Sequence, residues 1–436
     1  MTATTVGSER KGEIMDEDIE NKRKRNEDSS NCETATEHPG HPMDRRSFLT
    51  KSTLVAGGVL ASPLILASNG EPAQTQSTGT DEEKTITLPD FRFPLAQQPA
   101  RELPGGSARE ASAREFPVSK TIAGVLMTLK AGGLRELHWH ANAAEWAYVI
   151  DGHVRVTVVD PQGRIEIADF GPGDVWYFPR GHAHSIQGLG LGPGEAKFLL
   201  VFDNGYFSEF ATFSFTDWLA QTPKEIVAKN LNLRESDLKD LPNKEVYIAQ
   251  GPAPPPLPVT PISGPGTVLA PPLTHKYSLA SQKPLKRDRD GEVRLVSAKE
   301  FPISTNMTGG IINLAPGGLR ELHWHPNADE WQYILSGKIR LTVFASHGLA
   351  KVVELGAGDI GFAPMGYGHA LENAGGGPAE MLIVFNSGEY QEISLTTVLA
   401  AHPAYLLETN FHLPKSVIDK LPKKQEFITS GREGKK

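Results

Sequence analysis

The stretch Gly132-Gly-Leu-Arg-Glu-Leu-His-Trp-His140 decides the fold of this chain. A near copy, Gly317-Gly-Leu-Arg-Glu-Leu-His-Trp-His325, begins 185 residues later, and 15 of the 21 residues that can be aligned from these two starts are identical. Each copy places two histidines one residue apart. A string this specific, present twice, indicates a tandem duplication with a functional centre, or the relic of one, in each half.

Short β-rich runs with turn residues between them surround the first copy. These expected strands are Lys120–Leu129, Trp146–Ile150, Val154–Val159, Ile165–Phe170, Val175–Phe178 and Lys197–Phe202. Many short strands at roughly even spacing indicate a sandwich or barrel. A helix with Thr216 as its N-cap is expected next, and a second helix towards Leu241-Pro242. The sequence therefore predicts an all-β protein with helical appendices, built from two tandem barrels.

The chain divides into a leader at 1–67, a first barrel domain at 85–250, a linker at 251–274 and a second barrel domain at 275–430. The linker is rich in proline, which predicts a stiff, extended segment. By Pro223 and Pro403 the offset between the halves has fallen from 185 to 180 residues. We interpret this as a loss of five residues just after the last barrel strand of the second half.

The leader differs in composition from the rest of the chain. Its first 44 residues are polar and dense in charge, which predicts disorder. Asp44-Arg-Arg-Ser-Phe-Leu-Thr-Lys51 and the apolar run from Leu54 to Ala67 then match a twin-arginine signal peptide, although a chance Arg-Arg ahead of an apolar helix is the alternative. We expect cleavage after Ala67 and export to the periplasm or the cell exterior. We also hypothesise that translation starts at Met43 rather than Met1.

Composition excludes several classes of function. The 436 residues are 39% hydrophobic and 22% charged, with a net charge of -8, which fits a soluble protein with material for two cores. No concentrated basic face suggests a nucleic-acid partner. The apolar run of the leader is too short for a comfortable membrane span, so we expect no membrane association after processing. Cleavage would also remove Cys32, the only cysteine, and with it any thiolate chemistry.

The histidine motif predicts a metal site in each half. His138 and His140 would point to one face of a strand, and Glu145 would return to that face from the next strand. His184, which follows a run of turn residues, is a fourth candidate. The corresponding residues of the second half are His323, His325, Glu330 and His369. Three imidazoles and a carboxylate suit octahedral Mn(II) or Fe(II) with two open positions, and zinc is a further option. The alternative, histidines that are merely hydrogen-bonded in a core, is disfavoured by four candidates repeated at the same spacing.

Arg135 and Arg320 each lie three residues before the first histidine of their motif. At that odd spacing an ideal strand would point the arginine away from the metal, but a bulge or turn at Gly132-Gly133 would bring Arg135 back. There it would pair with a small dicarboxylate. From the residues alone, a surface salt bridge is an equally good interpretation. We interpret His182 as a turn residue at the barrel mouth rather than a fifth ligand.

These motifs resemble a known family. Gly-x5-His-x-His-x4-Glu-x6-Gly, followed by Gly-x5-Pro-x-Gly-x2-His, is similar to the two-part signature of the cupin superfamily. The two-barrel arrangement, the repeated Arg-Glu-Leu-His-Trp-His and Trp176-Tyr-Phe-Pro179 resemble the bacterial oxalate decarboxylases over about residues 85–430. The resemblance implies Mn(II) at both sites, with Fe(II) less favoured, and dioxygen as a catalytic partner. It implies oxalate as the substrate, bound by Arg135 and, in the second half, Arg320, with formate and carbon dioxide as products.

The resemblance also implies a catalytic loop. The lid of the family reads Ser-Glu-Asn-Ser, and the corresponding residues are Ser208-Glu209-Phe210-Ala211. Glu209 is therefore the expected general acid/base, while Arg135 would stabilise the radical anion. The absence of the asparagine and the second serine leaves room for some oxidation of the substrate.

The second half departs from the family at one position. The family has a glutamate near its second metal where this chain has Ile383, although Tyr390 is kept. Glu392 aligns with Glu209, in a loop that is two residues shorter. We therefore expect the second site to bind metal in a structural role, or to support electron transfer, rather than to act as an independent catalyst.

Two other functions stay open. A two-barrel oxalate oxidase, which yields carbon dioxide and hydrogen peroxide, shares the ligands and the substrate but lacks the glutamate of the lid. A ligand-binding or storage protein of the same architecture typically loses ligands, whereas all eight are present here. Phe91–Phe93 and Lys276-Tyr277 resemble arms that cross to the other barrel or to a neighbouring molecule. With the helical appendices and the family resemblance, they suggest a homo-oligomer, either a trimer or a hexamer.

Overall fold

The computed structural model describes residues 87–192, 194–207, 212–262 and 273–430. The expected leader with its signal peptide and Cys32, the segment 208–211 with Glu209, and linker residues 263–272 lie outside these ranges. Within them, no helix combines the length and the apolar character needed to cross a membrane.

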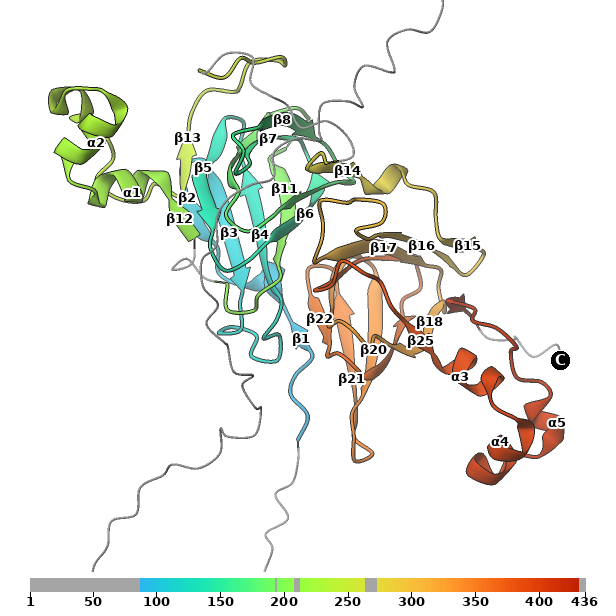
Figure 1. Ribbon diagram of the computed structural model, residues 1–436. Helices are drawn as coiled ribbons and strands as arrows, with labels where there is room; N and C mark the ends of the chain where they lie inside the picture. The colour runs from blue at the N-terminus through green and yellow to red at the C-terminus, as the bar shows by residue number, and fades with distance from the viewer. Residues whose placement is uncertain (1–86, 193, 208–211, 263–272, 431–436) are drawn as a thin grey trace, which may run out of the picture. The chain divides into compact units, whose positions relative to one another are not determined.

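The first barrel contains two facing antiparallel sheets (Figure 1). One has the order β14-β9-β6-β11-β4-β3-β2, and the other has the order β12-β5-β10-β7-β8, with β13 also pairing with β5. The strands are β2 (Arg101–Leu103), β3 (Gly106–Ala111), β4 (Ala123–Leu129), β5 (Gly133–His140), β6 (Glu145–Asp151), β7 (Val154–Val159), β8 (Ile165–Phe170), β9 (Asp174–Phe178), β10 (Ala183–Gly188), β11 (Ala196–Phe202), β12 (Thr212–Ser214), β13 (Ile248–Gln250) and β14 (Lys276–Ser278).

The second barrel repeats this architecture. Its sheets have the orders β1-β22-β19-β24-β17-β16-β15 and β21-β20-β23-β18-β25, with β26 also pairing with β18. The strands are β1 (Arg92–Phe93), β15 (Lys286–Asp288), β16 (Gly291–Val296), β17 (Thr308–Leu314), β18 (Leu319–Trp324), β19 (Glu330–Ser336), β20 (Lys338–Phe344), β21 (Ala350–Gly356), β22 (Ile360–Ala363), β23 (Gly368–Asn373), β24 (Ala379–Phe385), β25 (Ile393–Ser394) and β26 (Ile428–Thr429). The expected pair of tandem barrels is confirmed.

The two arms are exchanged between the barrels of one chain. β1, from the start of the first half, pairs with β22 of the second barrel, and β14, from the start of the second half, pairs with β9 of the first. Of the two destinations expected for the arms, the structure therefore shows the other barrel of the same chain. One of the two edge strands of each larger sheet therefore comes from the opposite half of the sequence.

A shared apolar core joins the larger sheets. It contains the fully buried Trp146 and Trp331 among residues of both halves. A Cβ added at Gly309 would lie 2.2 Å from the Trp146 ring, and one added at Gly124 would lie 2.6 Å from the Trp331 ring. The indole of each barrel thus packs against a glycine of the other barrel, so positions 124 and 309 exclude larger side chains.

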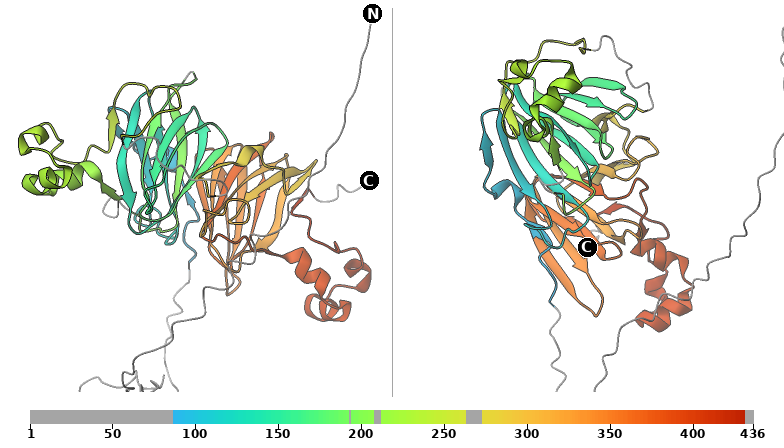
Figure 2. Two further views of the ribbon diagram at one scale, coloured as in Figure 1. Left: turned by 45° about the horizontal axis from the view of Figure 1, so that its top comes forward. Right: turned by 60° about the vertical axis from the view of Figure 1, so that its left-hand side comes forward.

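The helical appendices are also present, and Figure 2 shows that both groups project from the barrels instead of covering a sheet. They comprise α1 (Phe215–Gln221), α2 (Lys224–Leu231), α3 (Leu395–Ala401), α4 (Ala404–Phe411) and α5 (Lys415–Ile418). The expected N-cap was wrong by two residues. Ser214 caps α1 by accepting a hydrogen bond from the amide of Asp217, whereas the Thr216 hydroxyl donates to Glu136.

The five residues missing from the second half are lost at two places, not one. β10 and β23 start 185 residues apart, whereas β11 and β24 start 183 apart, so two residues are lost in the turn between these strands. Ser214 and Ser394, the N-caps of α1 and α3, are 180 apart, so three more are lost after β11 and β24. The prediction that all five follow the last barrel strand was therefore wrong.

Candidate metal centres

A bulge in β5 brings Arg135 onto the same face as the metal ligands. Against β10, His138 pairs with His184 and Arg135 pairs with Ile186, so three residues of β5 span two of β10. The extra residue reverses the alternation of side chains, and both Arg135 and His138 are buried. The expected bulge therefore exists, but it lies between the arginine and the histidine rather than at Gly132-Gly133. β18 shows the same irregularity between its arginine and its histidine.

The predicted ligands converge in both barrels. In each group, one candidate ligand atom from every residue lies within 4.8 Å of the others, and all the residues are buried. Two strands of the smaller sheet and one strand of the larger sheet supply them in each barrel, with His325 just beyond the end of its strand. The groups are His138, His140, Glu145 and His184, and His323, His325, Glu330 and His369.

Backbone carbonyls fix the histidine tautomers. In the first centre, Nδ1 of His138 lies 2.7 Å from the Glu136 carbonyl and Nδ1 of His184 lies 2.9 Å from the His182 carbonyl. A carbonyl oxygen only accepts, so Nδ1 carries the proton and Nε2 presents its lone pair to the centre. His182 thus orients a candidate ligand through its backbone, which agrees with its expected role as a turn residue.

The second centre repeats this arrangement completely. The carbonyls of Glu321, Gln391 and Tyr367 accept from Nδ1 of His323, His325 and His369 over 2.6, 2.7 and 3.0 Å. In the first centre His140 differs, because its Nδ1 lies 2.9 Å from the Thr212 hydroxyl, which can accept or donate. Five of the six imidazoles are therefore held with Nε2 free to bind metal.

Burial and mutual contacts give the ligands the protonation states that a metal needs. Burial lowers the pKa of His140 to about 4 and that of His323 to about 3, so both rings are neutral near pH 7. Burial on its own would raise the pKa of Glu145 and Glu330, but the neighbouring histidines outweigh it and lower both. Neutral imidazoles around an ionised carboxylate form a set ready to bind a cation.

The converging lone pairs of the first centre also favour a cation between them. The buried Nε2 of His184 has no hydrogen-bond partner among the described residues. It lies 3.4 Å from Oε2 of Glu145, towards which Nε2 of His140 also points over 3.1 Å. Nitrogen and carboxylate lone pairs this close repel each other unless a positive charge lies between them. Nitrogen and oxygen donors without sulfur suit a divalent metal such as Mn(II) or Fe(II).

The other carboxylate oxygen of each centre is held by a different kind of donor. Oε1 of Glu145 accepts from the Trp176 indole over 2.8 Å, whereas Oε1 of Glu330 accepts from the Gln332 amide over 2.9 Å. Trp176 pairs across its sheet with Ala147, and Gln332 pairs with Gly361. Sequence reasoning missed this function of both side chains. The signal was available, because the 185-residue offset aligns Trp176 with Gly361 and Ala147 with Gln332.

Arg135 lies at the first centre as a buried cation. Its guanidinium carbon is 4.1 Å from the centre of the Tyr247 ring, and Nη1 donates to the Tyr247 carbonyl over 3.4 Å. Burial, and next the charge of Arg135, lower the pKa of His138, so the guanidinium lies within electrostatic reach of the candidate ligands. Among the described residues, it has no carboxylate partner. The next residue, Glu136, accepts instead from the amides of Tyr247 and Val246 and anchors that segment.

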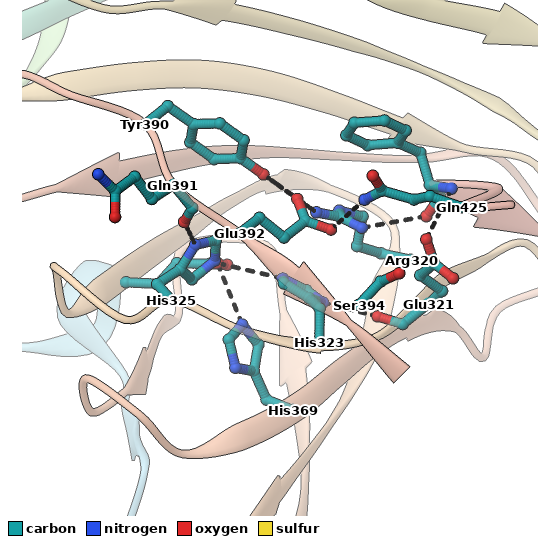
Figure 3. Close-up of polar contacts among 12 residues, drawn as sticks. Arg320, Glu321, His323, His325, His369, Tyr390, Gln391, Glu392, Ser394 and Gln425 are labelled. Atoms are coloured by element: carbon teal, nitrogen blue, oxygen red, sulfur yellow. Dashed lines mark hydrogen bonds and ion pairs between the residues drawn. The ribbon is translucent and has the colours of Figure 1, made fainter. Parts of the chain in front are cut away.

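Arg320 occupies the equivalent position of the second centre, where a carboxylate already holds it (Figure 3). Its Nη2 donates to Oε2 of Glu392 and, over 3.1 Å, to the Tyr390 hydroxyl, while Nη1 donates to the Phe427 carbonyl over 3.2 Å. Oε1 of Glu392 accepts from Gln425 over 2.6 Å. Sequence reasoning aligned Glu392 with the lid glutamate and did not predict that its carboxylate pairs with Arg320.

Strand pairing also corrects the alignment of Glu392. Ser214 pairs with His138 and Ser394 pairs with His323. Two residues before these serines stand Thr212 and Glu392, so Glu392 occupies the position of Thr212 rather than that of Glu209, and its loop is three residues shorter rather than two. Ile383, where the family was expected to carry a glutamate, is buried in the apolar core of the second barrel.

Comparisons with known proteins agree with this architecture. The cupin family model matches residues 94–239 and 277–419. Oxalate decarboxylase OxdC of Bacillus subtilis is 43% identical over 342 residues, which cover 78% of this chain and 87% of that protein. A probable oxalate decarboxylase of Arthroderma benhamiae is 32% identical over 348 residues, covering 79% of this chain and 84% of that protein.

Solved structures give the same result. A structure of the Bacillus subtilis enzyme, described in terms of its Mn(II) centres, superimposes with a TM-score of 0.74 at 41% identity and covers 80% of this chain and 90% of that one. A variant of that enzyme with its Ser-Glu-Asn-Ser segment replaced superimposes equally well. This chain is therefore a two-barrel member of the cupin family and belongs to the oxalate decarboxylases within it.

Proposed function

We propose that the protein is an oxalate decarboxylase that converts oxalate to formate and carbon dioxide at its first centre. The observation that carries the proposal is Arg135, a buried cation beside the metal ligands with no carboxylate partner in the described part of the chain. A buried guanidinium favours a bound anion, and its two parallel N–H groups match a carboxylate. Membership of the oxalate decarboxylases supports oxalate as that anion.

We further propose Mn(II) as the metal at both centres, with Fe(II) less favoured. The donor sets fit either ion, and the Mn(II) centres of the Bacillus subtilis enzyme favour manganese. When bound, the metal would supply Lewis-acid and redox chemistry, with dioxygen as the catalytic partner.

The residues of the chain would bind the substrate and handle its charge and proton. Arg135 would hold one carboxylate of oxalate and stabilise the negative charge that develops as the carbon–carbon bond breaks. Glu209, which lies outside the described residues, would take the proton of singly protonated oxalate, formed by proton uptake from solution, and return it to carbon. Overall, oxalate dianion and one proton give formate and carbon dioxide, so the reaction consumes a proton and is favoured in acid.

An oxalate oxidase is the second candidate, because Phe210 and Ala211 replace the second half of the family lid. The products separate the two functions. Metal-loaded protein incubated with oxalate should release formate and carbon dioxide in equal amounts, with little hydrogen peroxide. Peroxide as the main product would overturn the decarboxylase proposal.

Replacement of the lid glutamate tests its assigned function. Glu209→Ala should lower formate production by about 100-fold or more, because a positioned acid/base contributes about that factor. Metal content should not change, because Glu209 is not among the eight ligands, and Ser208→Ala serves as the control in the same loop. Formate production that persists in Glu209→Ala would show that another group delivers the proton.

We also propose export through the twin-arginine pathway and assembly into a homo-oligomer, a trimer or a hexamer. The leader sequence supports the first proposal and the family resemblance supports the second. Mature protein that still carries residues 1–67 would contradict export with cleavage. A monomer in light scattering would contradict the assembly.

A further inference from the structure

The two equivalent arginines differ in what they hold. Arg135 and Arg320 occupy the same position before the histidine motif, and both are buried. Arg135 contacts a carbonyl and an aromatic ring, whereas Arg320 forms an ion pair with Glu392 in which the two side chains are only 3% and 4% exposed. Among the described residues, only Arg320 of the two is therefore paired with a carboxylate of the chain itself.

Glu392 is held as a bound carboxylate ligand would be. Its Oε2 accepts from both Arg320 and the Tyr390 hydroxyl, and its Oε1 accepts from the Gln425 amide over 2.6 Å. Figure 3 shows the carboxylate of Glu392 between Arg320, Tyr390 and Gln425, close to His323 and His325. Charge-assisted hydrogen bonds to both oxygens satisfy the carboxylate fully and leave Arg320 no free charge for a second anion.

The shorter loop of the second half explains how Glu392 reaches this place. Three residues are missing between β24 and α3 relative to the first half, and Glu392 stands where the first half has Thr212. In the first centre that position carries a hydroxyl, which contacts His140. A threonine there cannot neutralise Arg135, because its side chain has no charge.

We propose that Glu392 is a built-in occupant of the carboxylate-binding position of the second centre. It pairs with Arg320 and thereby confines the binding of a small dicarboxylate to the first centre. Glu392 is thus a specificity-determining residue that decides which of two metal-binding barrels accepts substrate. The inference rests on the proposed function in one respect, which is that it takes oxalate as the ligand.

The number of oxalate molecules bound per chain tests this inference. We would measure it by equilibrium dialysis of manganese-loaded protein with labelled oxalate, in the Glu209→Ala background to suppress turnover, with formate assayed in the same samples. The background protein should bind one oxalate per chain. Adding Glu392→Ala should create a second binding site, because it frees Arg320 beside the metal.

Two further variants keep the test decisive. Adding Arg320→Met to Glu392→Ala should remove the second site again, since the cation that attracts oxalate is then gone. If Glu392→Ala no longer retains manganese at both centres, Glu392→Gln replaces it, because glutamine keeps the shape of the side chain but has no charge. Glu392→Gln should also create a second oxalate-binding site. Manganese content shows in each case that both barrels are folded.

The outcomes separate this inference from the proposed function. Two oxalate molecules bound per chain with Glu392 intact, or no additional molecule after its replacement, would overturn the inference. If the background protein bound none and the Glu392 variants bound one, oxalate binding at the first centre would be refuted while the assignment of Glu392 would stand.

Discussion

At the scale of single residues, the two centres share their ligands and differ in what surrounds them. Trp176 and Gln332 donate to the same oxygen of their respective ligand glutamates from different strands. The residue opposite each donor is small: Ala147 faces Trp176, and Gly361 faces Gln332. A Cβ at Gly361 would lie 2.4 Å from the Gln332 amide oxygen, so the large side chain can come from only one of the two strands. Both centres therefore have a hydrogen-bond donor to Oε1 of the ligand glutamate, but the donor comes from a different strand in each.

Removal of either donor should weaken only its own centre. Trp176→Phe keeps most of the ring but loses the N–H, and Gln332→Leu keeps the approximate shape but loses the amide. Each should lower manganese affinity at its centre by about 10–100-fold, because partners that orient a ligand typically contribute that much. Titration with limiting manganese would measure the affinity of each centre, if the occupancy of each centre is followed by its own spectrum. Unchanged affinity in both variants would show that the donors do not orient the carboxylates.

Acid should destabilise the metal-free protein. The pKa values of His140 and His323, about 4 and 3 in the folded protein, lie below the ordinary imidazole value of 6.5. From pH 6.5 down to about 4, the unfolded chain therefore binds more protons than the folded chain, so the free energy of unfolding falls as the pH falls. The lowered pKa of Glu145 acts in the same direction below its ordinary value of 4.5.

Calorimetry of the metal-free protein between pH 7 and pH 4 would measure this dependence as a falling Tm. Manganese should raise the Tm by a similar amount at pH 7 and at pH 5, because His140 and His323 are still neutral in the folded protein at pH 5 and do not have to release protons to bind it. A metal-free Tm that stays constant or rises on acidification would contradict the protonation states assigned to the two centres.

At the scale of elements, the spacing of the motif predicted the ligands but not the path of the strand. Because side chains alternate along a strand, His138 and His140 could be assigned to one face, and the three-residue step to Arg135 required an irregularity somewhere. The two adjacent glycines suggested that this irregularity lies at Gly132-Gly133. The structure puts it between Arg135 and His138, where Glu136 anchors the amides of Val246 and Tyr247. That anchor lies 110 residues away, so local sequence could not reveal it.

The exchanged arms show a second limit of local sequence. The arm at the start of the second half places His275 in the first barrel, where its Nδ1 lies 2.7 Å from the buried Glu166. The amide of Tyr177 donates to the His275 carbonyl, and at the equivalent place in the second barrel the amide of Phe362 donates to the Phe91 carbonyl. An aromatic arm could be recognised from its composition. Its destination depends on which sheet edge is free, and only the assembled fold shows that.

At the scale of the whole molecule, duplication has produced two equivalent groups of candidate metal ligands, and we propose that the two centres differ in function. Both retain three histidines and a glutamate, and both place an arginine on the inner face of the barrel. The difference lies in the loops that follow the last barrel strands. The first half keeps Glu209 in a longer loop, whereas the shorter loop of the second half delivers Glu392 onto Arg320. We therefore expect oxalate to be bound and decarboxylated only at the first centre, where Arg135 has no carboxylate partner among the described residues.

Matched removal of the two arginines tests that claim most directly. Formate turnover and manganese content would be compared between Arg135→Met and the charge-neutral double variant Arg320→Met with Glu392→Leu. We expect Arg135→Met to lose turnover by about 100-fold or more, the usual cost of removing a group that stabilises developing charge. The double variant should retain turnover with manganese at both centres. Equal loss in the two variants, or turnover that survives Arg135→Met, would contradict the assignment of catalysis to the first centre.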